Sequence, residues 1–256
     1  MAKEDERMLK IKELCSGYGK KEVLCDVSLD IRGGELVSII GVNGCGKSTL
    51  LKSAVRMIPA IRGDVLVDGN SIKKMSRGEI ARSIAYLSQG RDTPEMTVGE
   101  MVLHGRFAHL RYPRIYKKRD REIALEAMRK MGVDAYCDLP VSALSGGMKQ
   151  NAYLAVALAQ DSEYILLDEP TTYLDISHQI SLVKTLQALA RDGKAVVTVM
   201  HDLPLAFSYS DRIAVIDGGR LVAFGTPKEI CESTVIERIF GVQVARCEDG
   251  SYAYKY

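Results

Sequence analysis

A glycine-rich segment that ends in a lysine and two hydroxyl residues is the first place in this chain where chemistry could occur. Glycines let successive backbone N–H groups converge on an anion, and the start of a helix favours negative charge. Lys47 would reach the β- and γ-phosphates of a nucleotide, and the Ser48 hydroxyl would ligate Mg²⁺. The segment matches G-x-x-x-x-G-K-[ST] and predicts a nucleoside triphosphate site. Its residues are Gly41, Val42, Asn43, Gly44, Cys45, Gly46, Lys47, Ser48 and Thr49.

Two adjacent carboxylates, Asp168 and Glu169, follow a short apolar run from Tyr164 to Leu167. Adjacent residues on a strand point to opposite sides, so the two acids cannot share one role. We expect Asp168 to hold Mg²⁺ through its water shell, and Glu169 to act as the general base that polarises the attacking water. Taken alone, such a pair is more often a capping or solvated feature of a strand end. The glycine-rich segment is what favours the catalytic interpretation.

Hydrophobic patterning indicates the elements that must position these residues. Met8 to Leu14 and Val27 to Ile31 alternate, which predicts half-buried strands of an antiparallel sheet. Leu36 to Ile40 has the pattern of a buried strand that ends at the glycine-rich segment, and helical spacing begins at Lys47. Strands alternate with helices beyond it, so the predicted fold is α/β with a mostly parallel sheet. Further strands are expected at Val65–Val67, Ile84–Leu87, Tyr164–Leu167 and Ala195–Met200, and helices within 97–132, Gly146–Gln160 and Ile176–Arg191. Local signals also predict a turn at Asp68–Gly69, a capping box of Thr97 and Glu100, a C-terminal glycine at Gly132 and a helix start capped by Thr226 with Pro227 in first position.

Composition excludes several classes of protein. The chain has 256 residues, of which 46% are hydrophobic and 27% charged, as in folded globular proteins of one or two domains. No run approaches the roughly 18 apolar residues of a membrane span, and the charged start lacks an apolar stretch, so we expect no secretory leader. The net charge of +2 favours no class of partner. Six cysteines without a C-x-x-C pair predict free thiols, and we expect a lowered pKa for Cys45 beside Lys47.

A second glycine-rich motif, Leu144-Ser145-Gly146-Gly147, opens a predicted helix, with Gln150 three residues further on. Together with the first motif and the two acids, it makes the chain resemble the nucleotide-binding subunit of ATP-binding-cassette (ABC) transporters. The resemblance extends from about Leu9 to Ile230, and the motifs occur in the order that this family has.

The resemblance implies roles for residues that would be weak signals alone. It implies that Tyr18 stacks on adenine, that Gln89 senses Mg²⁺ and couples to a permease, and that His201 contacts the γ-phosphate. It also implies that the Leu174–Asp175 loop crosses to a dimer partner. In the family, Ser145, Gly146 and Gly147 would face the phosphate loop of a second copy, so that two ATP molecules lie between two chains.

The same resemblance implies the architecture and the partners. The expected fold is a P-loop NTPase of ABC type, with a mostly parallel core sheet, an antiparallel β subdomain and a helical insert. A single domain would cover 1–256, with the core at about 8–96 and 160–256 and the insert at about 97–159. The implied partners are a second copy of the chain, integral-membrane permease subunits and, indirectly, a substrate-binding protein. ATP and Mg²⁺ are the implied cofactors, and the cytoplasmic face of the cell membrane is the implied location.

Residues 171–179 and 102–110 are similar to the ATPases of ferric siderophore, haem and cobalamin importers. They predict an ATP-hydrolysing subunit that powers import of a metal chelate through ATP-driven dimer closure. Two alternatives stay open, an ABC ATPase that serves another substrate, export included, and a soluble ABC ATPase without a transport role. Met148 and Asn151 depart from the glutamine and arginine usual in the family, which bears on turnover rather than on nucleotide binding.

Seven basic residues between Arg106 and Arg121 are interleaved with Phe107, Tyr112 and Tyr116. Out of context, this pattern is typical of a surface that binds single-stranded nucleic acid. Within the expected helical insert, permease docking, a solvated face or contact with anionic lipid are the favoured interpretations. We therefore expect no nucleic-acid partner.

Overall fold

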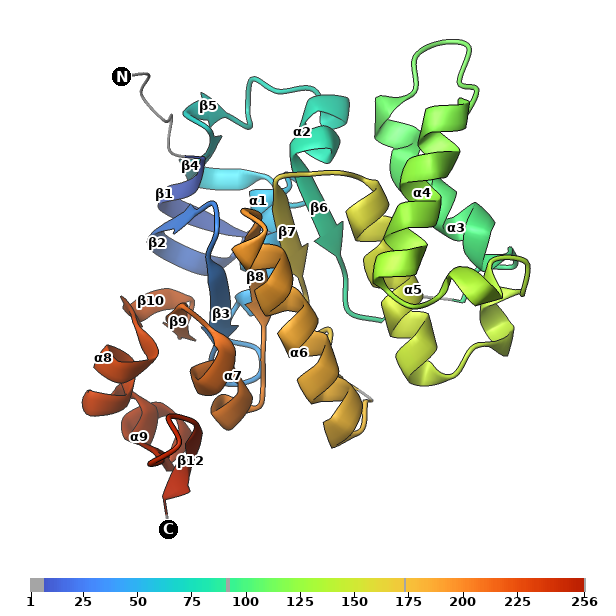
Figure 1. The fold of residues 1–256 in the computed structure, drawn as a ribbon. Coiled ribbons are helices and arrows are strands. Elements are labelled where there is room, and N and C mark those ends of the chain that lie inside the picture. Colours follow the sequence, from blue (N-terminus) through green and yellow to red (C-terminus); the bar gives the residue numbers. More distant parts are fainter. Residues whose placement is uncertain (1–6, 91–92, 173, 256) are drawn as a thin grey trace, which may run out of the picture.

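The computed structural model describes residues 7–90, 93–172 and 174–255. The first six residues of the charged start, and Tyr173 of the stretch that resembles importer ATPases, lie outside the described residues. Two sheets meet around a central helix, a group of helices lies to one side, and small C-terminal elements lie at the other end (Figure 1). The predicted α/β fold, with a mostly parallel sheet and an antiparallel subdomain, is confirmed.

The mostly parallel sheet has the strand order β10-β9-β3-β8-β7-β6, and only the β9–β10 pair in this order is antiparallel. Every residue of β3, β7 and β8 is buried, which explains why these strands are continuous apolar runs in the sequence. Parallel strands end at the same edge of a sheet, so the residues that follow them are gathered there. The bounds are β3 Leu36–Ile40, β6 Ile84–Leu87, β7 Tyr164–Leu167, β8 Ala195–Val199, β9 Arg212–Asp217 and β10 Arg220–Gly225.

The antiparallel sheet has the order β2-β1-β4-β5 and lies on the N-terminal side of the fold. The β1–β2 register shifts repeatedly between Ile11 and Gly17, and Glu13 and Asp26 have positive φ angles beside these shifts. Such bulges bend a strand and redirect its side chains. The expected Asp68–Gly69 turn joins β4 to β5. The bounds are β1 Met8–Tyr18, β2 Lys21–Arg32, β4 Ala60–Val67 and β5 Asn70–Ser71.

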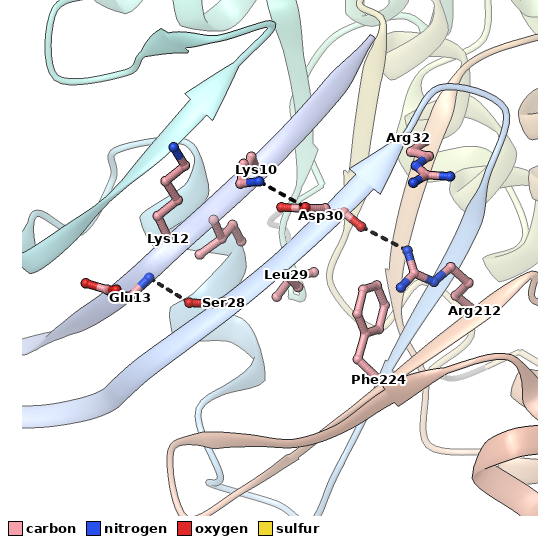
Figure 2. Close-up of a pocket in the computed structure, with 10 residues that line it drawn as sticks. Lys10, Lys12, Glu13, Ser28, Leu29, Asp30, Arg32, Arg212 and Phe224 are labelled. Carbon is pink, nitrogen blue, oxygen red and sulfur yellow. Dashed lines mark hydrogen bonds and ion pairs between the residues drawn. The ribbon is translucent and has the colours of Figure 1, made fainter. Parts of the chain in front are cut away.

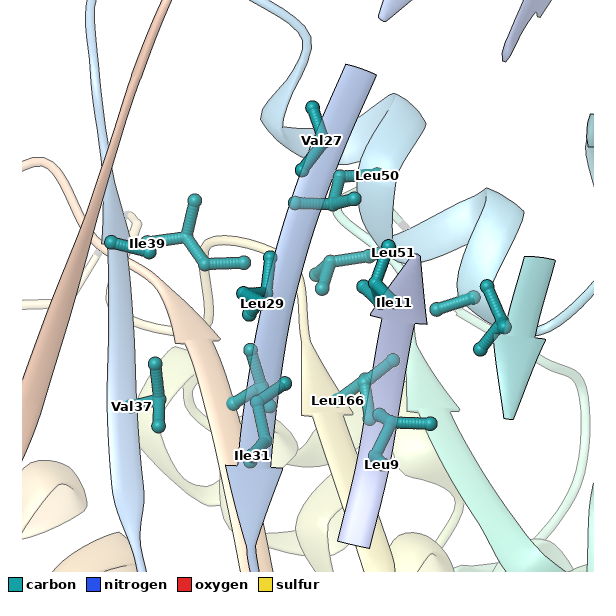
Figure 3. Close-up of a cluster of buried hydrophobic side chains, with 14 of the residues drawn as sticks. Leu9, Ile11, Val27, Leu29, Ile31, Val37, Ile39, Leu50, Leu51 and Leu166 are labelled. Carbon is teal, nitrogen blue, oxygen red and sulfur yellow. The ribbon is translucent and has the colours of Figure 1, made fainter. Parts of the chain in front are cut away.

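Helix α1, Lys47–Ala54, is packed between the two sheets. Leu50 and Leu51 belong to one buried cluster with Ile11 of the antiparallel sheet and with Ile39 and Leu166 of the parallel sheet (Figure 3). Burying a leucine contributes about 1.5–3 kcal/mol. The helix that follows the first glycine-rich segment is therefore fixed from both sides.

Helices α3, α4 and α5 pack on one another beside the parallel sheet (Figure 1). The expected capping box of Thr97 and Glu100 starts α3, and Gly132, with a φ of 66°, follows α4 as a C-terminal glycine. Helices were expected within 97–132, and the structure has α3, η1 and α4 there, with residues 110–117 not helical. The bounds are α3 Val98–His104, η1 Gly105–His109, α4 Lys118–Lys130, η2 Asp134–Tyr136, η3 Val141–Ala143 and α5 Gly146–Ala159.

The remaining helices cover the sheet and end the chain. Helix α6 begins at the expected residue, after the Asp175 cap, and α8 has the expected Thr226 cap with Pro227 at its first position. Among the described residues we find no helix with the length and apolar character that crossing a bilayer requires. The bounds are α2 Arg77–Ser83, α6 Ile176–Arg191, α7 Leu203–Tyr209, α8 Pro227–Glu232, α9 Val235–Phe240, β11 Gln243–Arg246 and β12 Tyr252–Lys255.

Candidate functional site

The first glycine-rich segment forms the turn between β3 and α1, at the carboxyl end of the parallel sheet. Gly46 has a φ of 110°, in the left-handed region that favours glycine. A Cβ at Gly46 would lie 2.6 Å from Leu24 Cδ2, and one at Gly41 would lie 2.2 Å from the carbonyl oxygen of Ile216. The backbone of Ile216 therefore excludes a side chain at Gly41, and the φ of Gly46 disfavours one there, so both positions of the loop keep a bare backbone.

Lys47 is buried, with 5% of its surface exposed. Its Nζ donates hydrogen bonds to the carbonyl oxygens of Gly41 at 2.8 Å and Val42 at 3.0 Å. A buried ammonium requires such partners, because leaving it unpaired is costly. The Lys47 amine therefore lies across the glycine-rich loop. The phosphate oxygens of a nucleotide can replace the two carbonyl oxygens that hold it.

Ser48 and Asp168 meet at the start of α1. The Ser48 hydroxyl donates to Asp168 Oδ1 at 3.0 Å, and the Tyr86 hydroxyl donates to Asp168 Oδ2 at 3.3 Å. Burial raises the pKa of the Asp168 carboxyl, although these hydrogen bonds act in the opposite direction. A hydroxyl beside a carboxylate provides the oxygen ligands that Mg²⁺ prefers, so these residues fit the expected cation.

Sequence reasoning did not single out Tyr86. The sequence held no local signal for it, because the pairing of Tyr86 with Leu166, two residues before Asp168, depends on the strand order of the folded sheet. Residues two apart on a strand share a face, so the phenol and the carboxylate are brought to the same side.

Glu169 joins residues that follow three different strands. Its Oε1 lies 2.6 Å from His201 Nε2, and its Oε2 accepts a hydrogen bond from Gln89 Nε2 and another from the Thr172 hydroxyl at 3.3 Å. Gln89, Glu169 and His201 each stand two residues beyond the end of β6, β7 or β8. These neighbouring strands are parallel, so their ends coincide and three residues distant in the sequence form one cluster.

The backbone of Glu169 has a φ of 51°, which is uncommon for a residue with a side chain. Asp168 and Glu169 have different partners, as expected, but strand alternation is not the cause. Strand β7 ends at Leu167, and the left-handed conformation of Glu169 turns its side chain towards His201. Strain of this kind concentrates at functional sites.

The expected lowering of the Cys45 pKa is wrong. The residue is 5% exposed, and burial raises the pKa of its thiol more than the nearby Lys47 charge lowers it. The sequence placed Cys45 beside a cation but could not indicate how completely the fold would desolvate it. Its sulfur lies against Gly41, where an added Cβ would come within 2.6 Å of it.

The second glycine-rich motif starts α5, where the Ser145 hydroxyl accepts a hydrogen bond from the Met148 N–H at 3.4 Å. A Cβ at Gly147 would lie 2.6 Å from Cδ2 of His178. The His178 ring is held by Asp175, whose carboxylate lies 2.8 Å from Nδ1. Hydrogen bonds from the His178 backbone, Ser177 and the His178 ring lower the pKa of Asp175 to about 2.

A hollow of about 250 Å³ is bordered by Gln89, Glu169, Thr172 and Gly146. Helix α5 therefore begins beside Gln89 and Glu169 of its own chain. Tyr18 lies elsewhere, at the end of β1, and is 53% exposed. An exposed aromatic ring at a hairpin tip is available for stacking.

A larger groove lies on the outer face of β1 and β2, next to β9 and β10 (Figure 2). Lys10 is paired with Asp30 at 3.1 Å, and Cζ of Arg212 lies 3.7 Å from the centre of the Phe224 ring. None of the predicted nucleotide-site residues lines this groove. The size of a groove therefore does not identify the candidate site in this protein, whereas the cluster of Gln89, Glu169 and His201 does.

Arg106, the first residue of the basic run, is not on a solvated face. It is 6% exposed, pairs with Asp120 at 3.3 Å and donates to the carbonyl oxygen of Ala159 at 2.8 Å. Arg106 thus joins η1 to α4 and α5 inside the helical group. Arg111 to Arg121 include the exposed basic residues of the run.

Comparison with known proteins agrees with this geometry. The family model described as ABC transporter matches residues 24–172. The chain is 41% identical to the ferric enterobactin transport ATP-binding protein FepC of Escherichia coli K12, over 94% of this chain and 90% of that protein. It is 36% identical to the iron(3+)-hydroxamate import ATP-binding protein FhuC of Bacillus subtilis 168, over 91% of this chain and 88% of that protein.

The fold also has close counterparts among solved structures. A structure described as an inward-facing conformation of a metal-chelate type ABC transporter superposes with a TM-score of 0.83, covering 98% of both chains at 24% identity. The ADP conformation of MJ1267, an ATP-binding cassette of an ABC transporter, superposes with a TM-score of 0.82 at 23% identity. At these identities the likeness supports the fold alone.

Proposed function

From the premise that this chain belongs to the ABC transporter family and is an ATP-hydrolysing transporter subunit, we propose that it powers the import of a ferric siderophore. The single observation that carries the catalytic part is the cluster of Gln89, Glu169 and His201 beside the Ser48–Asp168 pair. The substrate class is supported by relatives at 36% and 41% identity that are named for iron(3+)-hydroxamate and ferric enterobactin. Both relatives are matched over nearly their whole length.

We assign the chemical roles from the contacts. Lys47 exchanges its carbonyl partners for the β- and γ-phosphates, and the backbone of residues 41–46 surrounds the same phosphates. Mg²⁺ held by Ser48 and Asp168, with Gln89 nearby, would neutralise charge on the phosphate oxygens. Glu169 accepts the proton of the attacking water, and His201 orients that carboxylate at 2.6 Å. Tyr18 stacks on adenine.

The assembly belongs to the same proposal. Transporter subunits of this family dimerise and work with membrane permeases, and we propose that this chain pairs with itself. Ser145, Gly146 and Gly147 then complete the phosphate site of the partner copy. The single domain at 1–256, with a helical insert at about 97–159, docks through that insert on a permease at the cytoplasmic membrane face. A substrate-binding protein delivers the chelate to the permease.

Two measurements test this function. Purification of the tagged chain from detergent-solubilised membranes should yield an integral-membrane permease, and a soluble ABC ATPase would yield none. Cells whose only copy carries Glu169→Gln should lose uptake of a ferric siderophore while uptake of haem and cobalamin is unchanged. Loss of haem or cobalamin uptake with siderophore uptake intact would replace the proposed substrate.

A further inference from the structure

Two cysteines and a glutamate meet near the tip of the β1–β2 hairpin, which carries Tyr18. The sulfurs of Cys15 and Cys25 and a carboxylate oxygen of Glu22 all lie within 4.8 Å of one another. Cys15 is buried on β1, whereas Cys25 is partly exposed and Glu22 exposed on β2. Among the described residues, no other group of three such ligands is this close.

A β-bulge produces this meeting. Leu14 pairs with Val27 and Ser16 pairs with Leu24, so Cys15 alone faces both Cys25 and its neighbour on β2. In a regular strand, residues three apart such as Leu24 and Val27 point to opposite faces of the sheet. Both are buried here, because the extra residue of the bulge on β2 shifts the alternation of side chains. The bulge therefore places Cys15 opposite Cys25, and their sulfur atoms lie within 4.8 Å of each other.

Hydrogen-bond donors surround the sulfur atoms. Arg220 Nη2 donates to Cys25 Sγ at 3.1 Å, and the backbone N–H of Asp26 donates to Cys15 Sγ at 3.2 Å. N–H groups that bond to ligand sulfurs in this way orient and tune the thiolates of metal sites. The exposed carboxylate of Glu22 also lies within 4.8 Å of both sulfur atoms and can supply an oxygen ligand.

We propose that Cys15, Glu22 and Cys25 bind a soft divalent cation of the Zn²⁺ class, with water as the fourth ligand. Two sulfurs bound to one tetrahedral Zn²⁺ through bonds of about 2.3 Å lie roughly 3.8 Å apart. Because the sulfurs of Cys15 and Cys25 lie within 4.8 Å of each other, they need to approach by about 1 Å at most. Thiolates select Zn²⁺ over Mg²⁺, which separates this site from the one at Ser48 and Asp168. The exposed Glu22 gives the cation an entry route, and the displaced thiol protons pass to solvent.

The site lies two backbone hydrogen bonds from the phosphate loop. The Cys25 N–H donates to the Gly219 carbonyl oxygen at 2.9 Å, and the Gly219 N–H donates to the Cys45 carbonyl oxygen at 3.1 Å. Tyr18 is three residues beyond Cys15 on the same strand. A cation here would clamp the two strands of the hairpin and brace them against the loop, so we expect it to raise the melting temperature.

The test is a Co²⁺ titration of the full-length, reduced, metal-free chain without nucleotide. We expect one equivalent of Co²⁺ to produce a sulfur-to-cobalt charge-transfer band, which Zn²⁺ then abolishes. Cys25→Ser and Cys15→Ser should each reduce the band to about half, because one of two thiolates remains. Glu22→Gln should keep the band and weaken binding about tenfold or more, since losing even a group that only bonds to a ligand costs 10–100-fold. Cys247→Ser, which alters an exposed thiol elsewhere, is the matched control and should change nothing.

Three results would overturn the proposal. One is the absence of a sulfur-to-cobalt band in the wild-type chain, and another is a band that both Cys15→Ser and Cys25→Ser leave unchanged. The third is a Cys15–Cys25 disulfide found by peptide mapping after mild oxidation, together with no Co²⁺ binding by the reduced chain, which would assign a redox pair instead. Cys25→Ser and Glu22→Gln alter solvent-side residues, so they decide the question even where the buried Cys15→Ser variant does not fold. Zn²⁺ should raise the melting temperature of wild type and of Cys247→Ser, but not of Cys25→Ser.

Discussion

At the scale of single residues, Glu169 is the carboxylate on which the proposed chemistry depends. Glu169→Gln keeps the size of the side chain but removes the base, so ATP should still bind while hydrolysis falls by about 10²–10⁴-fold. Phosphate release and nucleotide binding, measured on the same preparation, separate these effects. The variant should accumulate as an ATP-bound dimer. Wild-type turnover by Glu169→Gln, under conditions where Lys47→Ala is inactive, would remove Glu169 from the catalytic role.

Two neighbouring glycines offer a matched comparison at the same scale. A methyl group at Gly147 would lie 2.6 Å from the His178 ring, whereas one at Gly146 would meet no atom of its own chain within 4 Å. The His178 ring must leave its position beside Asp175 to admit the methyl group, so Gly147→Ala should be about 0.5–1.5 kcal/mol less stable than Gly146→Ala, which should be neutral or slightly stabilising. Urea unfolding of the isolated chain measures both. His178→Ala in the Gly147→Ala background should restore much of the loss, and no recovery would contradict the contact.

At the scale of elements, the Arg106–Asp120 pair holds the helical group together. The side chains are 7% and 13% exposed, and Asp120 also accepts from the Lys117 N–H at the start of α4. Arg106→Ala leaves a buried carboxylate without its cation, so the free energy of unfolding should fall by about 3–5 kcal/mol. Arg121→Ala, on the exposed face of α4, is the control and should stay within about 0.5 kcal/mol of wild type. Equal stability of the two variants would contradict a structural role for Arg106.

The start of α6 should depend on pH in a defined direction. Hydrogen bonds lower the pKa of Asp175 to about 2, below the value of 3.8 for an ordinary aspartate. Because the pKa of Asp175 is lower in the folded state than in the unfolded state, its ionised carboxylate stabilises the fold. This stabilisation is complete above about pH 4 and is lost as the pH falls towards 2. Asp175→Asn keeps a capping oxygen without the charge, so wild type should be the more stable of the two at pH 5, and the difference should shrink in acid. A difference independent of pH would show that the charge does not contribute.

At the scale of the whole molecule, the proposed site is completed by a second copy. Hydrolysis by the purified chain alone should then rise more steeply than linearly with protein concentration. Mixing inactive Lys47→Ala with inactive Ser145→Arg should restore part of the activity, because a mixed dimer contains one intact composite site. Phosphate release from the mixture, compared with each variant alone, is the measurement. Full-rate hydrolysis by a demonstrated monomer would exclude the composite site.

Local sequence patterns were sufficient for the parts of this protein that depend on near neighbours. The glycine-rich loop before Lys47, the Thr97 and Thr226 caps and the start of α6 after Asp175 lie where the sequence predicted them. Caps, turns and apolar spacing act within one or two turns of chain, so their residues are all visible in a short window. The fold class followed from the alternation of such elements.

Tertiary structure alone decided which distant groups meet and how far they are removed from water. Strand order brings Gln89 and His201 to the carboxylate of Glu169, and a bulge brings Cys15 to Cys25. Desolvation reverses the expected pKa shift of Cys45, and packing turns an arginine of an apparently solvated run into half of a buried ion pair. The physical reason is common to all of these. Register, burial and electrostatic environment are set by elements that pack together from distant parts of the chain, and no short stretch of sequence contains both partners.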